Sequence, residues 1–282
     1  MIGAFSAAVV GPFADPIMQR ALLEVTLVGV CGGALGCWVI FYGLSYASES
    51  LAHGLFPGLV AAALLSLPLL LGAGVGIGVA ALGVAVASRI PGVGRNVAVA
   101  VVVTFLFGLG VLLALSPASP PGLQGLLFGD VLGASDSDLA VSGGLALGIV
   151  AVLWLLHARL LAVGFDRAFA RSLGISAAAA DAAVLSLLAG AILVGVQGMG
   201  NLLVVAVLVG PAATARQLAS RMKSMMLLSV AVAVLAGAAG LCLSYYAGTA
   251  AGASVAAAFV AAYLLTAFSR RSGLPLTVEE LP

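Results

Sequence analysis

The sequence contains few charged residues. Of its 282 residues only 7% are charged while 63% are hydrophobic, and the mean hydropathy is +1.27. A soluble domain has about 25% charged residues, because its surface must be hydrated. The composition therefore excludes a soluble fold and predicts a multi-pass protein of the plasma membrane, in contact with lipid.

The sequence also lacks the residues that several functional classes need. Its 11 basic and 10 acidic residues are scattered and give a net charge of +1, so no surface for nucleic acid is predicted. The three cysteines form no Cys-x-x-Cys pair, which argues against a disulfide scaffold. No Walker, His-Glu-x-x-His or Gly-x-Ser-x-Gly motif is present. We therefore expect a protein that is not an enzyme and holds no permanent cofactor.

What the chain has instead is long apolar segments. A helix that crosses about 30 Å of hydrocarbon needs about 20 apolar residues. We predict an all-α polytopic bundle of about nine transmembrane spans, forming a single domain over 21–271. A short extracytoplasmic or interfacial segment (1–20) precedes it and a cytoplasmic tail (272–282) follows it. The predicted spans are 21–43, 50–70, 72–88, 96–115, 139–160, 179–198, 199–219, 223–246 and 252–268.

The basic residues predict the orientation, since they accumulate on the cytoplasmic side of membrane proteins. With nine spans, ten of the eleven basic residues fall on one side, and Arg20 is the exception. The N-terminus is then outside and the C-terminus in the cytoplasm. The ten residues are Arg89, Arg95, Arg159, Arg167, Arg171, Arg216, Arg221, Lys223, Arg270 and Arg271.

Glycines four residues apart recur within the spans. Such pairs let two helix backbones approach closely in lipid, so they support a multi-helix bundle. The pairs are Gly29/Gly33, Gly32/Gly36, Gly72/Gly76 and Gly144/Gly148.

Two places interrupt the apolar pattern. The second and third spans nearly meet at Leu71 and Gly72, and the sixth and seventh meet around 198–200. Each break is either a tight turn or a discontinuous helix, whose freed backbone groups must face protein or water. The candidate pathway or hinge residues are Pro57, Gly58, Gln197, Asn201 and Pro211.

Glu49 and His53 are the most informative ionisable residues. They are four residues apart, so on a helix both side chains lie on one face. A carboxylate oxygen and an imidazole nitrogen can bind one cation, with imidazole favouring zinc and carboxylate extending the range to manganese. A structural pair that joins two helices is an equally open interpretation.

The other ionisable residues near the spans have simpler interpretations. Glu24 lies within one turn of Arg20, which predicts an interfacial ion pair. His157 is expected at the cytoplasmic interface, and Asp181 is expected to complement the N-terminal end of its helix. Asp130 follows a glycine, as in intramembrane aspartyl proteases, but no second aspartate accompanies it.

A short amphipathic helix is predicted in the cytoplasmic loop 161–178. Phe165, Phe169 and Leu173 recur every four residues, charged residues interleave with them, and Gly174 provides a stop. Such a helix either rests on lipid headgroups or docks into a soluble partner. The spacing alone does not choose between the two.

Together these segments resemble the permease subunits of bacterial ABC importers for zinc and manganese. The similarity runs from about Pro12 to Phe268. The family motif, usually Asp-x-x-x-His followed by Pro-Gly, is similar to 49–58. The other similar segments, in chain order, are 12–22, 127–132, 166–175 and 202–216.

The resemblance implies a transporter built from several kinds of subunit. Two permease subunits, expected to be identical copies, would form the pathway, two cytoplasmic ATP-binding-cassette ATPases would carry the ATP, and an extracytoplasmic binding protein would deliver zinc or manganese. Glu49 and His53 would line the pathway, although Glu49 replaces the family's Asp, and the loop 248–252 lacks the acidic and proline residues often found there. The residues implied to couple to the ATPase are Phe165, Asp166, Arg167, Phe169, Ala170, Arg171, Leu173 and Gly174.

Three other functions are kept as alternatives. Because Glu49 departs from the family pattern, the substrate of an ABC permease could be something other than a metal. A secondary transporter driven by protons or sodium would need no ATPase. An intramembrane enzyme would use Asp130 or His53, but a second catalytic residue is missing from its sequence pattern.

Overall fold

The structure is a computed structural model that describes residues 11–91, 95–117 and 129–271. Within these ranges it contains ten α-helices, two short 3-10 helices and no strand. This confirms the all-α fold. The 3-10 helices are η1 (Gly11–Ala14) and η2 (Val131–Gly133), and the α-helices are α2 (Pro16–Phe41), α3 (Ser45–Leu64), α4 (Leu69–Ala87), α5 (Arg95–Ala114), α7 (Asp136–Phe165), α8 (Arg167–Ser172), α9 (Ala177–Met199), α10 (Asn201–Leu218), α11 (Met222–Ala247) and α12 (Ala251–Arg271).

Each predicted span corresponds to one of the long helices, but the first begins earlier than predicted. The Asp15 carboxylate accepts a hydrogen bond of 2.9 Å from the Ile17 backbone N–H, and Pro16 occupies the first helical position. Asp is a favoured N-cap residue and proline is suited to the first turn. The segment 1–20 therefore includes η1 and the first turn of α2.

The break between the second and third predicted spans was placed wrongly. Leu71 and Gly72 lie inside α4, and the chain turns at 65–68 instead. Ser66 has a positive φ of 54° there. Pro68 disfavours helical backbone at the preceding residue and so separates the two helices.

Six of the described helices are long and apolar enough to cross a membrane. The helices α4 and α10 contain shorter apolar stretches, Leu71–Ala87 and Leu203–Leu218, and α3 carries polar residues along its first half. The six helices are α2, α5, α7, α9, α11 and α12.

Helix α2 lies at the centre of the larger part of the bundle. A Cβ at Gly33 would lie 3.2 Å from Ser229 of α11, and a Cβ at Gly36 would collide with the Leu208 carbonyl oxygen of α10. The predicted glycine pairs of α2 therefore serve close helix packing. Gly144 of α7, from another predicted pair, has no atom of the described residues within 4 Å of its Cβ position.

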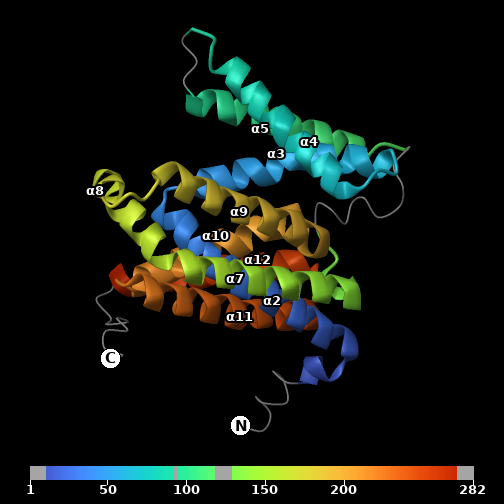
Figure 1. Cartoon of the computed structure of the whole chain (residues 1–282). Coiled ribbons are helices and arrows are strands. Elements are labelled where there is room, and N and C mark those ends of the chain that lie inside the picture. The colour runs from blue at the N-terminus through green and yellow to red at the C-terminus, as the bar shows by residue number, and fades with distance from the viewer. Residues whose placement is uncertain (1–10, 92–94, 118–128, 272–282) are drawn as a thin grey trace.

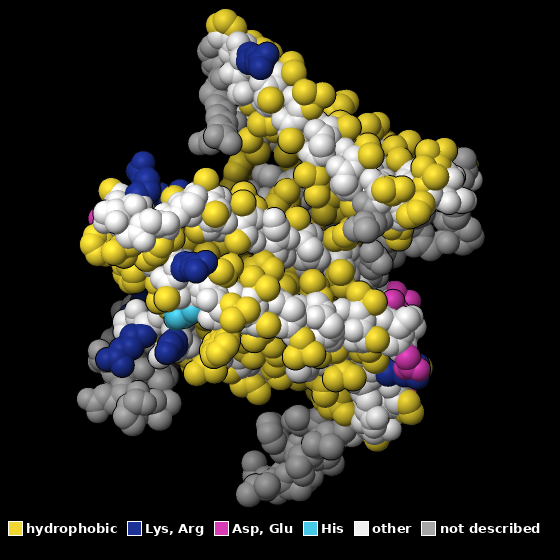
Figure 2. Space-filling view, viewed as in Figure 1, with side chains coloured by type: hydrophobic (Ala, Val, Ile, Leu, Met, Phe, Trp, Pro, Cys, Tyr) yellow, Lys and Arg dark blue, Asp and Glu magenta, His cyan; other side chains and the backbone are white. Residues whose placement is uncertain are grey.

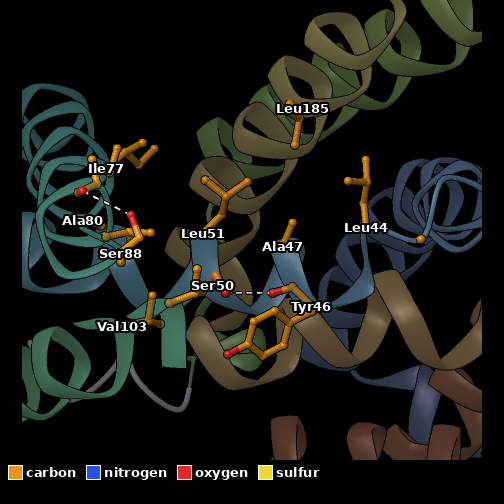
Figure 3. A pocket seen from close by; sticks show the side chains of 16 residues that line it. Leu44, Tyr46, Ala47, Ser50, Leu51, Ile77, Ala80, Ser88, Val103 and Leu185 are labelled. Atoms are coloured by element: carbon orange, nitrogen blue, oxygen red, sulfur yellow. Dashed lines mark hydrogen bonds between the residues drawn. The ribbon is translucent and has the colours of Figure 1, made fainter. Parts of the chain in front are cut away.

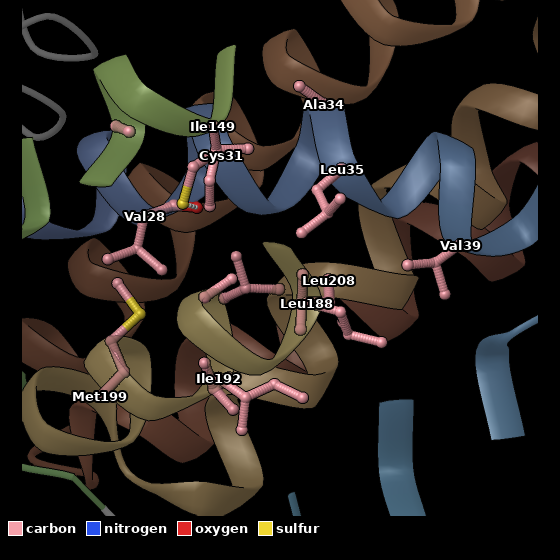
Figure 4. Close-up of a cluster of buried hydrophobic side chains, with 14 of the residues drawn as sticks. Val28, Cys31, Ala34, Leu35, Val39, Ile149, Leu188, Ile192, Met199 and Leu208 are labelled. Atoms are coloured by element: carbon pink, nitrogen blue, oxygen red, sulfur yellow. Dashed lines mark hydrogen bonds between the residues drawn. The ribbon is translucent and has the colours of Figure 1, made fainter. Parts of the chain in front are cut away.

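The main core forms where α2, α7, α9 and α10 meet. In Figure 4, Val28 and Leu35 of α2 face Leu188 and Ile192 of α9 and Leu208 of α10. All five side chains are buried. This part of the chain is held together by close packing rather than by charge, as in other membrane bundles.

Helices α3, α4 and α5 form a second group at the top of Figure 1. Gly58 of α3 and Gly72 of α4 contact each other's backbones, and an added Cβ at either would collide. Phe56 and Val60 of α3 pack with Ala114 of α5 in a small core of their own. Helix α3 also contributes Leu55 to the main core, so it joins the two groups.

Charged side chains gather at the two ends of the bundle. Figure 2 shows basic side chains mainly at the end that carries α8, and acidic side chains at the opposite end beside Arg20. The lateral surface between these ends is largely hydrophobic. This distribution is typical of a polytopic membrane protein.

Candidate functional site

Helix α3 positions the two predicted metal ligands. The chain leaves α2 through Gly43, whose φ is +69°, and the Leu44 N–H donates to the Val39 carbonyl at 2.7 Å. Helix α3 then continues without interruption from Ser45 past Pro57. Glu49 and His53 therefore lie one helical turn apart on one face, as predicted.

Glu49 is exposed and lies in a groove of about 550 Å³. The groove is bounded by α3, α10 and α12, and its other lining residues are mostly apolar, among them Val209 and Phe259. Among the lining residues that the structure describes none is basic, so no salt bridge within this groove occupies the Glu49 carboxylate.

His53 is half-buried and is held by an aromatic ring. Its imidazole stacks on Phe107 of α5, with ring centroids 4.3 Å apart and an angle of 23° between the planes. Phe107 in turn lies 5.6 Å from the ring of Phe56. The His53 Nδ1 atom is buried and has no hydrogen-bond partner among the described residues, so no protein group shown in the structure occupies this nitrogen.

The two residues do not form a metal site by themselves within one chain. In the part of the chain that the structure describes, no group of three or more His, Cys, Asp or Glu side chains is close enough to hold an ion. No ion pair joins Glu49 to His53 among those residues either. The two candidate ligands on α3 are fewer than the four of a closed zinc site.

A larger cavity of about 1180 Å³ lies on the other side of α3. Figure 3 shows Tyr46, Ser50 and Leu51 of α3 lining it together with Ile77 of α4 and Leu185 of α9. Its wall reaches Gly43 and Ser88, near the α8 end of the bundle. The N-terminal half of α3 thus separates two hollows, and Glu49 faces the smaller one.

The predicted break between α9 and α10 is a tight turn. Gly200, with φ of +79°, ends α9 and immediately precedes α10. Asn201 is the first residue of α10 and is fully buried. Gln197 lies in α9, with its side chain outside those the structure describes. Pro211 lies inside α10.

The predicted amphipathic helix is present as α8, but it is shorter at its start. The Asp166 carboxylate accepts hydrogen bonds from the Ala168 and Phe169 N–H groups at 2.7 and 3.0 Å, so α8 begins after Asp166. These bonds, that of Phe169 first, hold the pKa of the Asp166 carboxyl below its ordinary value. Phe165 is therefore the last residue of α7, and residues 161–165 of the predicted loop are helical.

The three apolar side chains predicted for this helix, which lie on and beside α8, are exposed. Phe165, Phe169 and Leu173 are 78%, 59% and 57% exposed, whereas Ala170 is fully buried against the bundle. Gly174 has a φ of +74° and ends the helix, as predicted. Arg171, another of the residues predicted to couple to the ATPase, donates from Nε to the Arg167 carbonyl at 3.2 Å. Three large apolar side chains therefore face outward at the basic end of the bundle.

Arg167 fastens α8 to the rest of the bundle. Its guanidinium makes two hydrogen bonds of 2.8 and 2.9 Å with the Asp181 carboxylate of α9. The same group lies 6.0 Å from the centre of the Tyr42 ring, a distance typical of a cation–π contact. Asp181 was expected to complement the N-terminal end of its own helix, so this ion pair was not predicted from the sequence.

Tyr42 connects this end of the bundle to α3. Its hydroxyl donates to the Leu160 carbonyl of α7 at 2.9 Å, and its neighbour Phe41 lies 5.3 Å from the Phe165 ring. Only Gly43 and Leu44 separate Tyr42 from the first residue of α3. Neither Tyr42 nor Phe107 was predicted, because their contacts join distant parts of the chain and leave no periodic signal in it.

Comparison with known proteins gives consistent findings. Residues 14–270 match the model of the ABC 3 transport family. The chain is 29% identical to the manganese import system permease protein ScaB of Streptococcus parasanguinis, over 89% of this chain and 90% of that protein. It is 30% identical to the manganese transport system membrane protein MntC of Halalkalibacterium halodurans, over 84% and 82%. A probable iron transport system membrane protein of Haemophilus influenzae is 29% identical, over 86% and 90%.

A solved structure shares the fold. The chain superimposes on PsaBC from Streptococcus pneumoniae, solved in complex with a Fab, with a TM-score of 0.84 and 27% identity. The match covers 93% of this chain and 95% of that chain.

Proposed function

This chain belongs to the ABC 3 transport family, and from that premise we propose that it is the permease subunit of an importer for a divalent transition metal. It is a multi-pass membrane protein and a transport component rather than an enzyme. Manganese is the favoured substrate because the similar ScaB and MntC proteins are manganese permeases by name. Zinc remains in the proposal through the imidazole of His53.

The observation that carries the metal assignment is the pair on α3. Glu49 presents a carboxylate to a groove, and His53 has a buried nitrogen without a partner. Carboxylate and imidazole together suit manganese and zinc. Two ligands bind weakly enough for an ion to be released, as a transport pathway requires.

We propose that a second copy of the chain completes the site. Two copies related by a two-fold axis would bring two Glu49 and two His53 side chains to one place, since such an interface uses the same surface of both subunits. The open groove beside Glu49, between α3, α10 and α12, is the surface proposed for this contact.

The remaining parts of the complex follow from the surfaces at the two ends. A cytoplasmic ATPase would dock on the exposed face of α8, and an extracytoplasmic binding protein would deliver the ion at the acidic end. All nine long helices would cross the membrane, with the N-terminus outside and the basic end in the cytoplasm. Helix α3, despite its polar first half, would then span at the centre of the dimer.

The proposed site is tested by removing one histidine at a time. We expect His53→Ala to abolish uptake of radioactive manganese or zinc into proteoliposomes that contain the assembled complex, because the imidazole ligand is lost. His157→Ala is the matched control, since His157 is the chain's other histidine and packs beside Trp38 toward the C-terminal end of α7. Uptake that survives His53→Ala in a correctly assembled complex would contradict the assignment.

The alternatives are separated by comparing the purified chain with the assembled complex. A purified chain that moves substrate under a proton or sodium gradient, without an ATPase, would favour a secondary transporter. A complex that hydrolyses ATP with its binding protein but moves no metal would favour a different substrate.

A further inference from the structure

The interior of the bundle contains polar atoms that the proposed metal pathway does not use. Glu24 of α2 and Asn201 of α10 are both 0% exposed. Oε1 of Glu24 accepts a hydrogen bond of 2.8 Å from the Ser142 hydroxyl of α7. Within the part of the chain that the structure describes, Oε2 of Glu24 and both polar atoms of the Asn201 amide have no hydrogen-bond partner. Buried polar atoms are rarely left unpaired, so these three atoms need an explanation.

Packing places Glu24 and Asn201 at the same turn. The helices α9 and α10 are antiparallel across the turn at Gly200, and Gly195 of α9 contacts Val204 of α10. A Cβ at Gly198, two residues before this turn, would lie 2.6 Å from Oε1 of Glu24. Asn201 is the first residue after Gly200 and is fully buried. The carboxyl of Glu24 and the amide of Asn201 are therefore both buried at the α9–α10 turn.

No basic side chain among the described residues is paired with Glu24. Arg20, one turn earlier on α2, lies 3.0 Å from Asp136 of α7 in an exposed ion pair, so the predicted pair of Arg20 with Glu24 is wrong. The other charged side chains that the structure describes at this end are acidic, namely Asp15 before α2, Asp130 before η2 and Asp138 of α7. Within the described residues, α9, α10 and α11 have no charged side chain at this end. An ionised carboxylate is strongly disfavoured in such a setting.

We propose that Glu24 and Asn201 form a buried site that binds one proton. With the carboxyl protonated, its O–H donates to Oδ1 of Asn201, and Nδ2 of Asn201 donates to Oε1, which still accepts from Ser142. This two-bond ring satisfies all three unpaired atoms at once. An ionised carboxylate would instead leave Oδ1 facing a negative oxygen without any donor.

The bound proton ties α2 to the α9–α10 turn. Loss of the proton would break the ring and place a charge against Gly198, so the turn would have to open to water. This site lies apart from Glu49 and His53, so its proton is bound whichever ion the permease moves.

The proposal is tested with the full chain in lipid nanodiscs. We expect the infrared spectrum at neutral pH to contain the carbonyl band of a protonated carboxylic acid, and Glu24→Gln to lose that band. As the pH is raised, the wild-type band should disappear and the thermal unfolding midpoint should fall with it by several degrees. The Glu24→Gln midpoint should not change over the same range, because an amide pair keeps the two-bond ring without a titratable proton.

Glu24→Ala is the matched variant that removes the ring altogether. It should be less stable than Glu24→Gln at every pH, since Asn201 is then left unpaired. A neutral-pH wild type without the acid band, or Glu24→Gln as unstable as Glu24→Ala, would overturn the proposal. Recovery of the wild-type midpoint at high pH by added sodium or manganese would also overturn it, because the cluster would then be a metal-cation site. None of these readouts depends on metal uptake, so a failed metal assignment would not affect them.

Discussion

At the scale of single residues, glycines define how closely the helices pack, and a few polar side chains define the candidate site. Gly36 and Gly58 occupy positions where an added Cβ would strike a neighbouring backbone, so the helices there approach as closely as backbones can. Glu49 and His53 were recognisable from their spacing, since four residues make one turn. Phe107, which fixes the His53 ring, was not recognisable, because it comes from another helix.

The packing role of Gly36 gives a prediction at this scale. Gly36→Ala should lower the free energy of unfolding by about 1–3 kcal/mol, the usual cost of overpacking a tight contact, because its Cβ would collide with the Leu208 carbonyl. Gly144→Ala is the control, since nothing lies within 4 Å of its Cβ position, and it should be neutral or slightly stabilising. Thermal unfolding of the purified variants in detergent measures both, and equal effects would contradict the packing argument.

At the scale of elements, α8 and α3 are connected through the C-terminal end of α2. Arg167 holds α8 to Asp181 of α9 and lies over the Tyr42 ring. Tyr42 is followed almost at once by α3. A displacement of α8 by a docked ATPase would therefore reach the helix that carries Glu49 and His53 along a short route of direct contacts.

This route predicts a loss of coupling when the ion pair is removed. Asp181→Asn should reduce the amount of metal moved per ATP hydrolysed, while the complex still assembles and keeps its basal ATPase activity. Arg159→Ala is the control, because Arg159 is an exposed basic residue at the same end of α7. The ratio is measured from simultaneous ATPase and uptake assays, and an unchanged ratio in Asp181→Asn would exclude this route.

At the scale of the whole molecule, the two candidate ligands on α3 do not make a complete metal site. Among the described residues no group of three or more His, Cys, Asp or Glu side chains could hold an ion, and Glu49 faces an open groove. Helices α3, α4 and α5 also form a group that leans away from the rest (Figure 1). These features fit a subunit whose central surface is covered by a second copy.

The dimer predicts cross-linking through Glu49. In a Cys242→Ser background, where Cys31 and Cys37 remain buried, Glu49→Cys should form a dimer with a short bifunctional thiol reagent. Trp154→Cys should not, because Trp154 is 78% exposed on the lateral surface of α7 and would face lipid. The products are separated by gel electrophoresis, and cross-linking at 154 rather than 49 would place the interface elsewhere.

The sequence by itself determined that this protein lies in a membrane and where its long helices are. Apolar segments with few charges have no stable place in water, so composition and length were sufficient to predict the membrane bundle and to locate every long helix. The tertiary structure alone decided which polar side chains meet. Glu24 lies with Ser142 rather than Arg20, and Arg167 lies with Asp181, because such pairs depend on how distant helices pack and in what register, which no local spacing encodes.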